Sequence, residues 1–109
     1  MSKPSDLVQG TLDLLLLKIL ALEPMHGWAI SQRLKQVSGD VLQVSDGSLY
    51  PALQRMLIKG WVTAEWGESE NRRRARYYRL TGPGRKQLSA EVSEFEKVMR
   101  AITRIIQPA

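Results

Sequence analysis

A run of arginines in the second half of the chain is the densest group of side chains in this sequence that could bind a ligand. From Arg72 to Arg79 the residues are RRRARYYR, with five arginines and no acid. Guanidinium groups are permanently charged, planar donors that match phosphate oxygens, so this segment predicts contact with a polyanion. The preceding residues 64–71 hold three acids and no base. The alternative is therefore that the arginines pair with Glu68 and Glu70, in exposed pairs weak enough to be exchanged for phosphate.

A second set of polar residues lies on a segment with helical periodicity, residues 44–60. Its apolar residues follow the i, i+4, i+7, i+8 pattern of one buried helix face: Leu49, Leu53, Met56 and Leu57. The opposite face holds Asp46, Ser48, Tyr50, Pro51, Gln54 and Arg55. Gln54 can pair with adenine, and Arg55 with guanine or with a phosphate. Taken alone, an ordinary solvated helix face explains these residues equally well.

The start of this helix has two candidate caps. Ser45 is a good N-cap, but it places Pro51 beyond the first turn, where proline removes a backbone hydrogen bond. Ser48 as the cap would place Pro51 inside the first turn. We favour Ser45 with a local distortion at Pro51, and we expect the helix to end at Gly60.

The sequence contains no residue pattern that supports catalysis or metal binding. It has no cysteine, one histidine and eleven scattered acids, and it lacks metal-ligand spacings, a glycine-rich phosphate loop and a nucleophile beside a histidine. We therefore expect no enzyme activity, no metal and no cofactor. His26 is expected to be a helix cap or a surface residue, and Trp28, Trp61 and Trp66 are expected to be packing anchors rather than a ligand site.

Length and charge place further limits on the function. A chain of 109 residues fits one domain, and a formal charge of +5 favours polyanionic partners without distinguishing DNA, RNA and acidic membranes. The N-terminal residues lack the features of a signal peptide. The most apolar stretch, residues 12–23, is interrupted by Asp13 and Lys18 and is too short to cross a bilayer. Together with the absence of cysteine, this predicts a cytoplasmic protein without a membrane partner.

The periodicity along the chain predicts three helices, a hairpin and a long final helix. The expected elements are helices over residues 12–22, 29–39 and 45–60, strands over 61–66 and 75–80, an exposed loop over 67–74 and a helix from Thr81 onward. The neighbours Tyr77 and Tyr78 must point to opposite sides of their strand, so one belongs to the core and the other can touch a backbone phosphate.

The final helix has an apolar stripe with alternating spacings of four and three residues. The stripe consists of Leu88, Val92, Phe95, Met99, Ile102 and Ile106. One small core cannot cover six large apolar side chains, so we expect a homodimer, with Leu14 and Leu17 of the partner's first helix contributing to the interface. The alternative is that the helix folds back on its own domain. The predicted fold is mainly α with a small β-hairpin: a winged helix-turn-helix over residues 1–82 and a C-terminal dimerisation helix over 83–109.

Three segments resemble the PadR family of bacterial transcriptional regulators: GTLDLLLLKILALEPMHGWAI from Gly10, GSLYPALQRMLIKGWV from Gly47, and RARYYRLTGPG from Arg74 to Gly84. The resemblance implies a winged-helix repressor of the short subfamily, which dimerises through a single C-terminal helix and whose members often release DNA when a small effector binds. It also implies that HGW, residues 26–28, opens the supporting helix and that GSLYP, residues 47–51, opens the recognition helix. The RRRARYY segment lies on the wing.

We therefore expect a sequence-specific regulator that binds a palindromic operator in double-stranded DNA as a homodimer. The expected DNA contacts are His26, Gly27, Trp28, Ser45, Gly47, Ser48, Tyr50, Pro51, Gln54, Arg55, Arg72, Arg73, Arg74, Arg76 and Tyr78. The alternative function is a winged-helix protein-interaction module without specific DNA binding, in which the basic wing meets an acidic protein surface.

Overall fold

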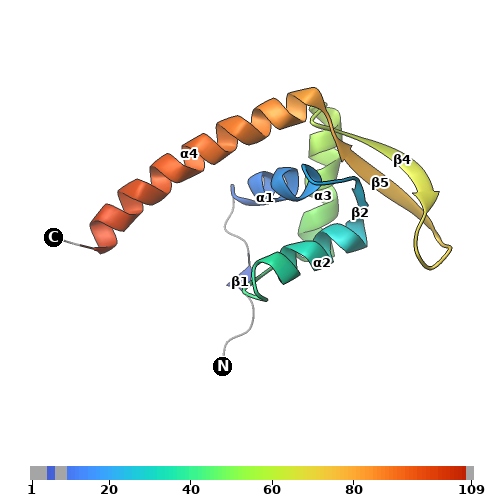
Figure 1. The fold of residues 1–109 in the computed structure, drawn as a ribbon, viewed down its shortest axis with the longest axis horizontal. Helices are drawn as coiled ribbons and strands as arrows, with labels where there is room; N and C mark the ends of the chain where they lie inside the picture. Colours follow the sequence, from blue (N-terminus) through green and yellow to red (C-terminus); the bar gives the residue numbers. More distant parts are fainter. Residues whose placement is uncertain (1–4, 7–9, 108–109) are drawn as a thin grey trace.

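The computed structural model describes residues 5–6 and 10–107, which form a small helical core, a twisted hairpin and a long projecting helix (Figure 1). The helices are α1 (Leu12–Leu20), α2 (Gly27–Val37), α3 (Asp46–Ile58) and α4 (Gly82–Ile106). The strands are β1 (Ser5–Asp6), β2 (Met25–His26), β3 (Leu42–Gln43), β4 (Val62–Glu68) and β5 (Arg74–Leu80). The predicted mainly α fold with a hairpin is confirmed.

The sheet has one strand more than the sequence predicted. Its order is β2-β5-β4, and all its pairings are antiparallel. In the hairpin, Val62 pairs with Leu80 at the base and Glu68 pairs with Arg74 near the tip. The added strand β2 pairs with β5 only at Tyr77 and Tyr78. A separate parallel pair, β1 with β3, was also missed, because two-residue strands show no alternation that a sequence pattern could reveal.

Helix α1 lies at the centre of the core and contacts α2, α3, α4 and β5. Its residues Leu16 and Leu17 have no exposed surface, and Leu14 is only 8% exposed. The expectation that Leu14 and Leu17 line a dimer interface was therefore wrong, because the chain's own core already buries them. A helix with apolar residues on more than one side can be covered by its own chain or by a second copy, and here its own chain covers it.

Helix α3 begins where the sequence predicted. Ser45 is the N-cap residue in extended conformation, and its hydroxyl contacts that of Ser48 at 3.3 Å. The helix continues through Pro51, whose missing N–H leaves the Gly47 carbonyl without its usual partner one turn later. The buried face consists of Leu49, Ala52, Leu53 and Met56, so the opposite face must be the exposed one.

The start of α4 is fixed against the end of α3 by hydrogen bonds and by one close approach. The Thr81 hydroxyl accepts a hydrogen bond from the Gly84 N–H at 3.0 Å and donates one to the Gly60 carbonyl at 2.7 Å. A Cβ on Gly84 would collide with the backbone oxygen of Trp61 and with the Leu80 side chain. These contacts set the direction in which α4 leaves the domain.

Replacing Gly84 with alanine should destabilise the protein by roughly 1–3 kcal/mol, because the added methyl group would collide with the backbone of Trp61, which cannot move aside as a side chain can. Gly82→Ala is the matched control: a Cβ there meets nothing within 4 Å, and its effect should stay within about 0.5 kcal/mol. Urea unfolding measures both. Equal stabilities of the two variants would contradict the close approach.

Candidate nucleic-acid interface

The exposed face of α3 presents the residues that the sequence assigned to it. Ser45, Asp46, Gly47, Ser48, Tyr50, Pro51, Gln54 and Arg55 are all exposed. The side chain of Gln54 makes no hydrogen bond with any other described residue and is available to an external partner. An exposed amide of this kind can donate to and accept from the edge of a base.

Arg55 is held by a residue far away in the sequence. Its guanidinium donates to Oδ1 of Asp13 in α1 at 3.0 Å, and its side chain remains about half exposed. Sequence reasoning placed Arg55 correctly on the outer face but missed this partner, since no local pattern connects α1 with α3. The ion pair restrains the guanidinium of Arg55, so Gln54 is the freer of the two side chains to bind an external partner.

Tyr50 lies against the start of α2. A Cβ on Gly27 would collide with the Tyr50 ring and hydroxyl, so only glycine lets the Tyr50 ring lie this close to α2. Partial burial, followed by the charge of Asp46 and the proximity of Tyr78, raises the pKa of Tyr50 above its usual value, and the phenol keeps its proton. Gly27 is itself buried, so the expectation that it contacts DNA was wrong: it is a spacer between two helices.

His26 is the N-cap of α2. Its Nδ1 accepts a hydrogen bond from the Ala29 N–H at 3.2 Å, which confirms the prediction of a cap. The ring is buried against Tyr77 with 5.2 Å between ring centroids, so the expectation of a direct contact between His26 and DNA was wrong. The neighbouring Trp28 is 66% exposed and remains available on the surface.

The arginines of the wing are exposed, as predicted, and most of them lie at or beside the loop between β4 and β5. Arg74 stacks over the Trp66 ring at 4.6 Å, and Arg76 lies 5.9 Å from the Tyr78 ring. In the described structure Arg72, Arg73 and Arg74 make no ion pair with Glu68 or Glu70, so the proposed pairing across the loop is not observed. Their charges are therefore not neutralised by those acids.

One tyrosine of β5 lies in the core and the other lies nearer the surface. Tyr78 was expected to be the one that contacts DNA, and the structure places it in the core. Tyr78 is only 6% exposed and belongs to the core, so its expected contact with a phosphate was wrong. Tyr77 is half-buried, and its hydroxyl donates to the Glu68 carbonyl at 3.1 Å. The period of two predicts opposite sides but does not tell which side is the core.

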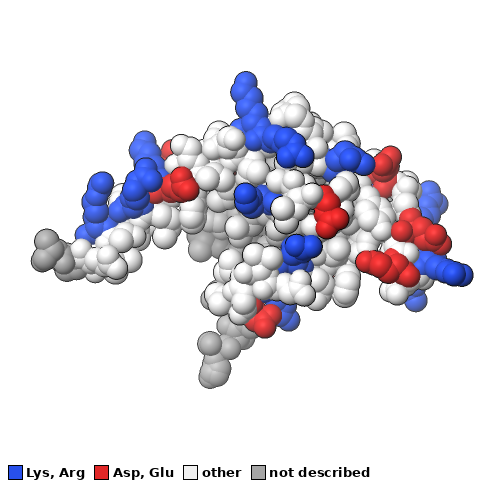
Figure 2. All heavy atoms as spheres, in the orientation of Figure 1, with Lys and Arg blue, Asp and Glu red and all other residues white. Residues whose placement is uncertain are grey.

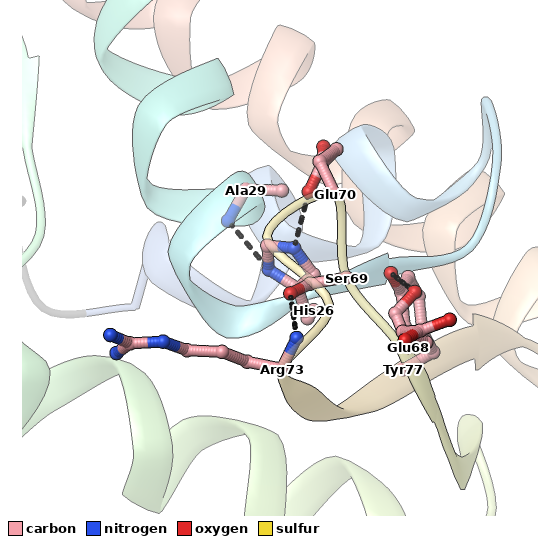
Figure 3. Close-up of polar contacts among 7 residues, drawn as sticks. All are labelled: His26, Ala29, Glu68, Ser69, Glu70, Arg73 and Tyr77. Carbon is pink, nitrogen blue, oxygen red and sulfur yellow. Dashed lines mark hydrogen bonds and ion pairs between the residues drawn. The ribbon is translucent and has the colours of Figure 1, made fainter.

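The start of α2 brings these features together. Tyr50 at the beginning of α3 packs on Gly27, and Glu70 in the wing loop contacts His26 at 3.5 Å (Figure 3). The exposed face of α3 and the arginine loop therefore lie on two sides of a helix N-terminus, where the backbone dipole favours anions. On the face seen in Figure 2, basic side chains with a few acids among them follow α4, and acidic and basic side chains are interleaved at the wing.

A sequence profile of the Transcriptional regulator PadR-like family matches residues 16–90. The chain belongs to this family. An uncharacterised protein of Lysinibacillus sphaericus is 30% identical over 98 residues, which cover 90% of each chain. Membership of the PadR-like family supports a role as a DNA-binding transcription regulator, and the family is not a class of enzymes.

Solved structures share the fold along almost the entire chain. A transcriptional regulator from Clostridium thermocellum superposes with a TM-score of 0.83 at 24% identity, covering 91% of this chain and 96% of the other. A PadR family transcription regulator from Clostridium difficile superposes with a TM-score of 0.76 at 26% identity, covering 90% and 100%. These structures confirm the winged-helix architecture for this chain.

Within residues 5–6 and 10–107, no group of three or more histidines and acids is placed to hold a metal ion. In the same part of the chain, no helix has both the length and the apolar character needed to cross a membrane.

Proposed function

We propose that this PadR-like protein is a homodimeric repressor that binds a palindromic operator. The observation that supports this most directly is the exposed polar face of α3 beside the unpaired arginines of the wing. In a helix-turn-helix protein the second helix of the pair enters the major groove, which is the role proposed for α3. The wing arginines would then neutralise phosphates or enter the adjacent minor groove. Chromosomal DNA as the partner would place the protein in the cytoplasm.

The dimer proposal is supported by the exposure of the stripe on α4. Leu88 packs against the chain's own core and Val92 is partly buried, but the stripe loses that cover further along the helix, which projects from the domain (Figure 1). Phe95, Met99, Ile102 and Ile106 are 40%, 40%, 39% and 69% exposed. The alternative, in which the helix folds back on its own domain, thus accounts for only the first part of the stripe.

A second copy of the chain is the occupant that fits this stripe. Its spacing of four and three residues is the repeat with which two helices interlock, and the same patch on both copies satisfies twofold symmetry. Burying each large apolar side chain contributes roughly 1.5–3 kcal/mol, so four such residues from each copy can offset the entropy lost on association.

An effector is part of the same proposal. The exposed side of α4 has a shallow hollow lined by Phe95, Glu96, Met99, Arg100, Thr103 and Arg104. A second copy packed on the stripe would enclose this hollow between apolar and basic groups. We infer that a small anionic or aromatic molecule bound there would alter the spacing of the two DNA-binding domains and release the operator.

The base-reading role of Gln54 is tested by selecting bound duplexes from random DNA. Wild type should enrich one motif, and Gln54→Ala should lose preference at one or two base pairs of each half-site, a change of roughly 1–3 kcal/mol per contact. Asp13→Ala, which removes the carboxylate that holds Arg55, should alter neighbouring positions if Arg55 reads a base.

The control for this selection is Gln32→Ala, which removes an exposed amide from α2. Its motif should equal that of wild type. A Gln54→Ala motif identical to the wild-type motif would remove Gln54 from base recognition. If no duplex of any sequence bound at micromolar protein, the repressor proposal would fail and the protein-interaction alternative would stand.

The α4 interface is tested by Phe95→Asp and Met99→Asp. Because these residues lie beyond the part of the stripe that packs on the chain's own core, the variants should stay folded, sediment as monomers and lose tight operator binding. Ala101→Asp adds the same charge off the stripe and should remain dimeric. A wild type that sediments as a monomer at tens of micromolar, or charged variants that stay dimeric, would contradict the interface.

A further inference from the structure

The loop at the tip of the wing has a tight internal structure built around Ser69. The Ser69 N–H donates to the Arg73 carbonyl at 2.8 Å, and the Arg72 N–H donates to the Ser69 carbonyl at 2.9 Å. The Ser69 hydroxyl accepts from the Arg73 N–H at 3.3 Å. Arg72 adopts a left-handed backbone conformation with φ of 59°, which a side-chain-bearing residue adopts at some cost. The shape of the loop is therefore set by its own hydrogen bonds.

The sheet does not fix where this loop lies relative to the helices. Strand β2 pairs with β5 only at Tyr77 and Tyr78, so the outer part of the hairpin, up to Glu68 and Arg74, is a ribbon of two strands. Ribbons of two strands twist strongly and are only marginally stable by themselves. The position of the arginines at the tip must therefore depend on some contact outside the sheet.

One side chain supplies such a contact. The Nδ1 atom of His26 accepts from the Ala29 N–H, which assigns the ring proton to Nε2, and Nε2 lies 3.5 Å from Oε1 of Glu70. The edge contact with Tyr77 holds the ring in place. His26 thus joins the start of α2, strand β5 and the wing loop, and Figure 3 shows the Arg73 side chain extending away from Glu70.

On charge alone, a glutamate at position 70 would weaken DNA binding by the wing. A carboxylate beside the wing arginines repels the phosphates that those arginines would bind. A hydrogen bond from its own backbone, followed by the one from His26, lowers the pKa of Glu70, so the carboxylate is charged at neutral pH. By contrast, the side chain of Glu68, in the same wing, has no partner among the described residues.

We propose that Glu70 and His26 are a positioning pair: their contact fastens the wing loop to the start of α2 and so sets where Arg72 and Arg73 meet the DNA. The proposal rests on the proposed function, because it concerns the same interface. Neither residue touches DNA in this account. Both act through the arginines that the loop presents.

The test compares the removal of two wing acids, with random-sequence duplex DNA as the probe. Glu68→Ala and Glu70→Ala each delete one negative charge, so charge alone predicts that both bind DNA more tightly. The positioning account predicts opposite signs. Glu68→Ala should bind more tightly, whereas Glu70→Ala should bind about threefold to fivefold more weakly, the size of effect that one exposed polar contact can have. The salt slope of Glu70→Ala should also fall by about one phosphate contact.

A second variant separates the cap from the contact with the wing. His26→Asn keeps a good N-cap for the Ala29 N–H but is too short to reach Glu70. It should therefore weaken binding as much as Glu70→Ala does, and the double variant should be no weaker than either single one. Amide hydrogen exchange should accelerate in residues 70–73 of both variants and stay unchanged in α1 and α3, which a general loss of stability would not produce.

A third arm distinguishes failure of this proposal from failure of the proposed function. The variant with Arg72→Ala, Arg73→Ala and Arg74→Ala should bind every duplex more weakly than wild type. If it binds as tightly as wild type, the wing does not contact DNA and the proposed wing function fails, together with the positioning role. If it binds more weakly while Glu68→Ala and Glu70→Ala both strengthen binding, the positioning proposal alone is overturned.

Discussion

The burial of α1 is the constraint on which the rest of this structure depends. Leu16 and Leu17 have no exposed surface, and the helix contacts α2, α3, β5 and the first part of α4. Burial of each such leucine contributes roughly 1.5–3 kcal/mol to the stability of the fold. The elements around α1 are therefore oriented with their apolar faces toward it. The polar face of α3 and the outer stripe of α4 are the surfaces that this packing leaves uncovered. The first of these surfaces is the proposed DNA interface, and the second is the proposed dimer interface.

The start of α2 is the second point at which several elements depend on one another. Gly27 lets Tyr50 approach, and His26 caps the helix while contacting Tyr77 and Glu70. Helix α3 and the wing both bear proposed DNA contacts, and both pack against the start of α2. Two adjacent residues, His26 and Gly27, therefore set the position of α3 relative to the wing. The resemblance to the family assigned this HGW segment to DNA contact, whereas the structure assigns two of its three residues to packing and leaves only Trp28 exposed.

The sequence predicted what local periodicity can encode. The order of helices and strands, Ser45 as the N-cap residue and the exposed face of α3 were found where the pattern placed them, whereas the predicted loop 67–74 is shorter, because β4 extends to Glu68 and β5 begins at Arg74. The two-residue strand β2 was missed because it is too short to show a period. Leu14 and Leu17 were assigned to an interface because a helix that is apolar on more than one side does not reveal which neighbour covers each side.

The contacts between distant residues could not be predicted from the sequence. Asp13 meets Arg55 and His26 meets Glu70 only because the core brings their elements together, and no spacing along the chain indicates either pair. Tyr78 shows a related limit: alternation along β5 separates it from Tyr77, but the choice of the buried side depends on how the sheet packs against α1. The detailed chemistry of the candidate site is thus a property of the tertiary structure.

The central claim, that two copies joined through α4 place two α3 helices on one operator, is tested most directly by the stoichiometry and footprint of the protein on its selected DNA. The account predicts two chains per duplex and two inverted half-sites with centres about one helical turn, roughly 10 base pairs, apart. It also predicts that an isolated half-site binds far more weakly than the pair. One chain protecting a single half-site, with an affinity equal to that for the full operator, would contradict the account.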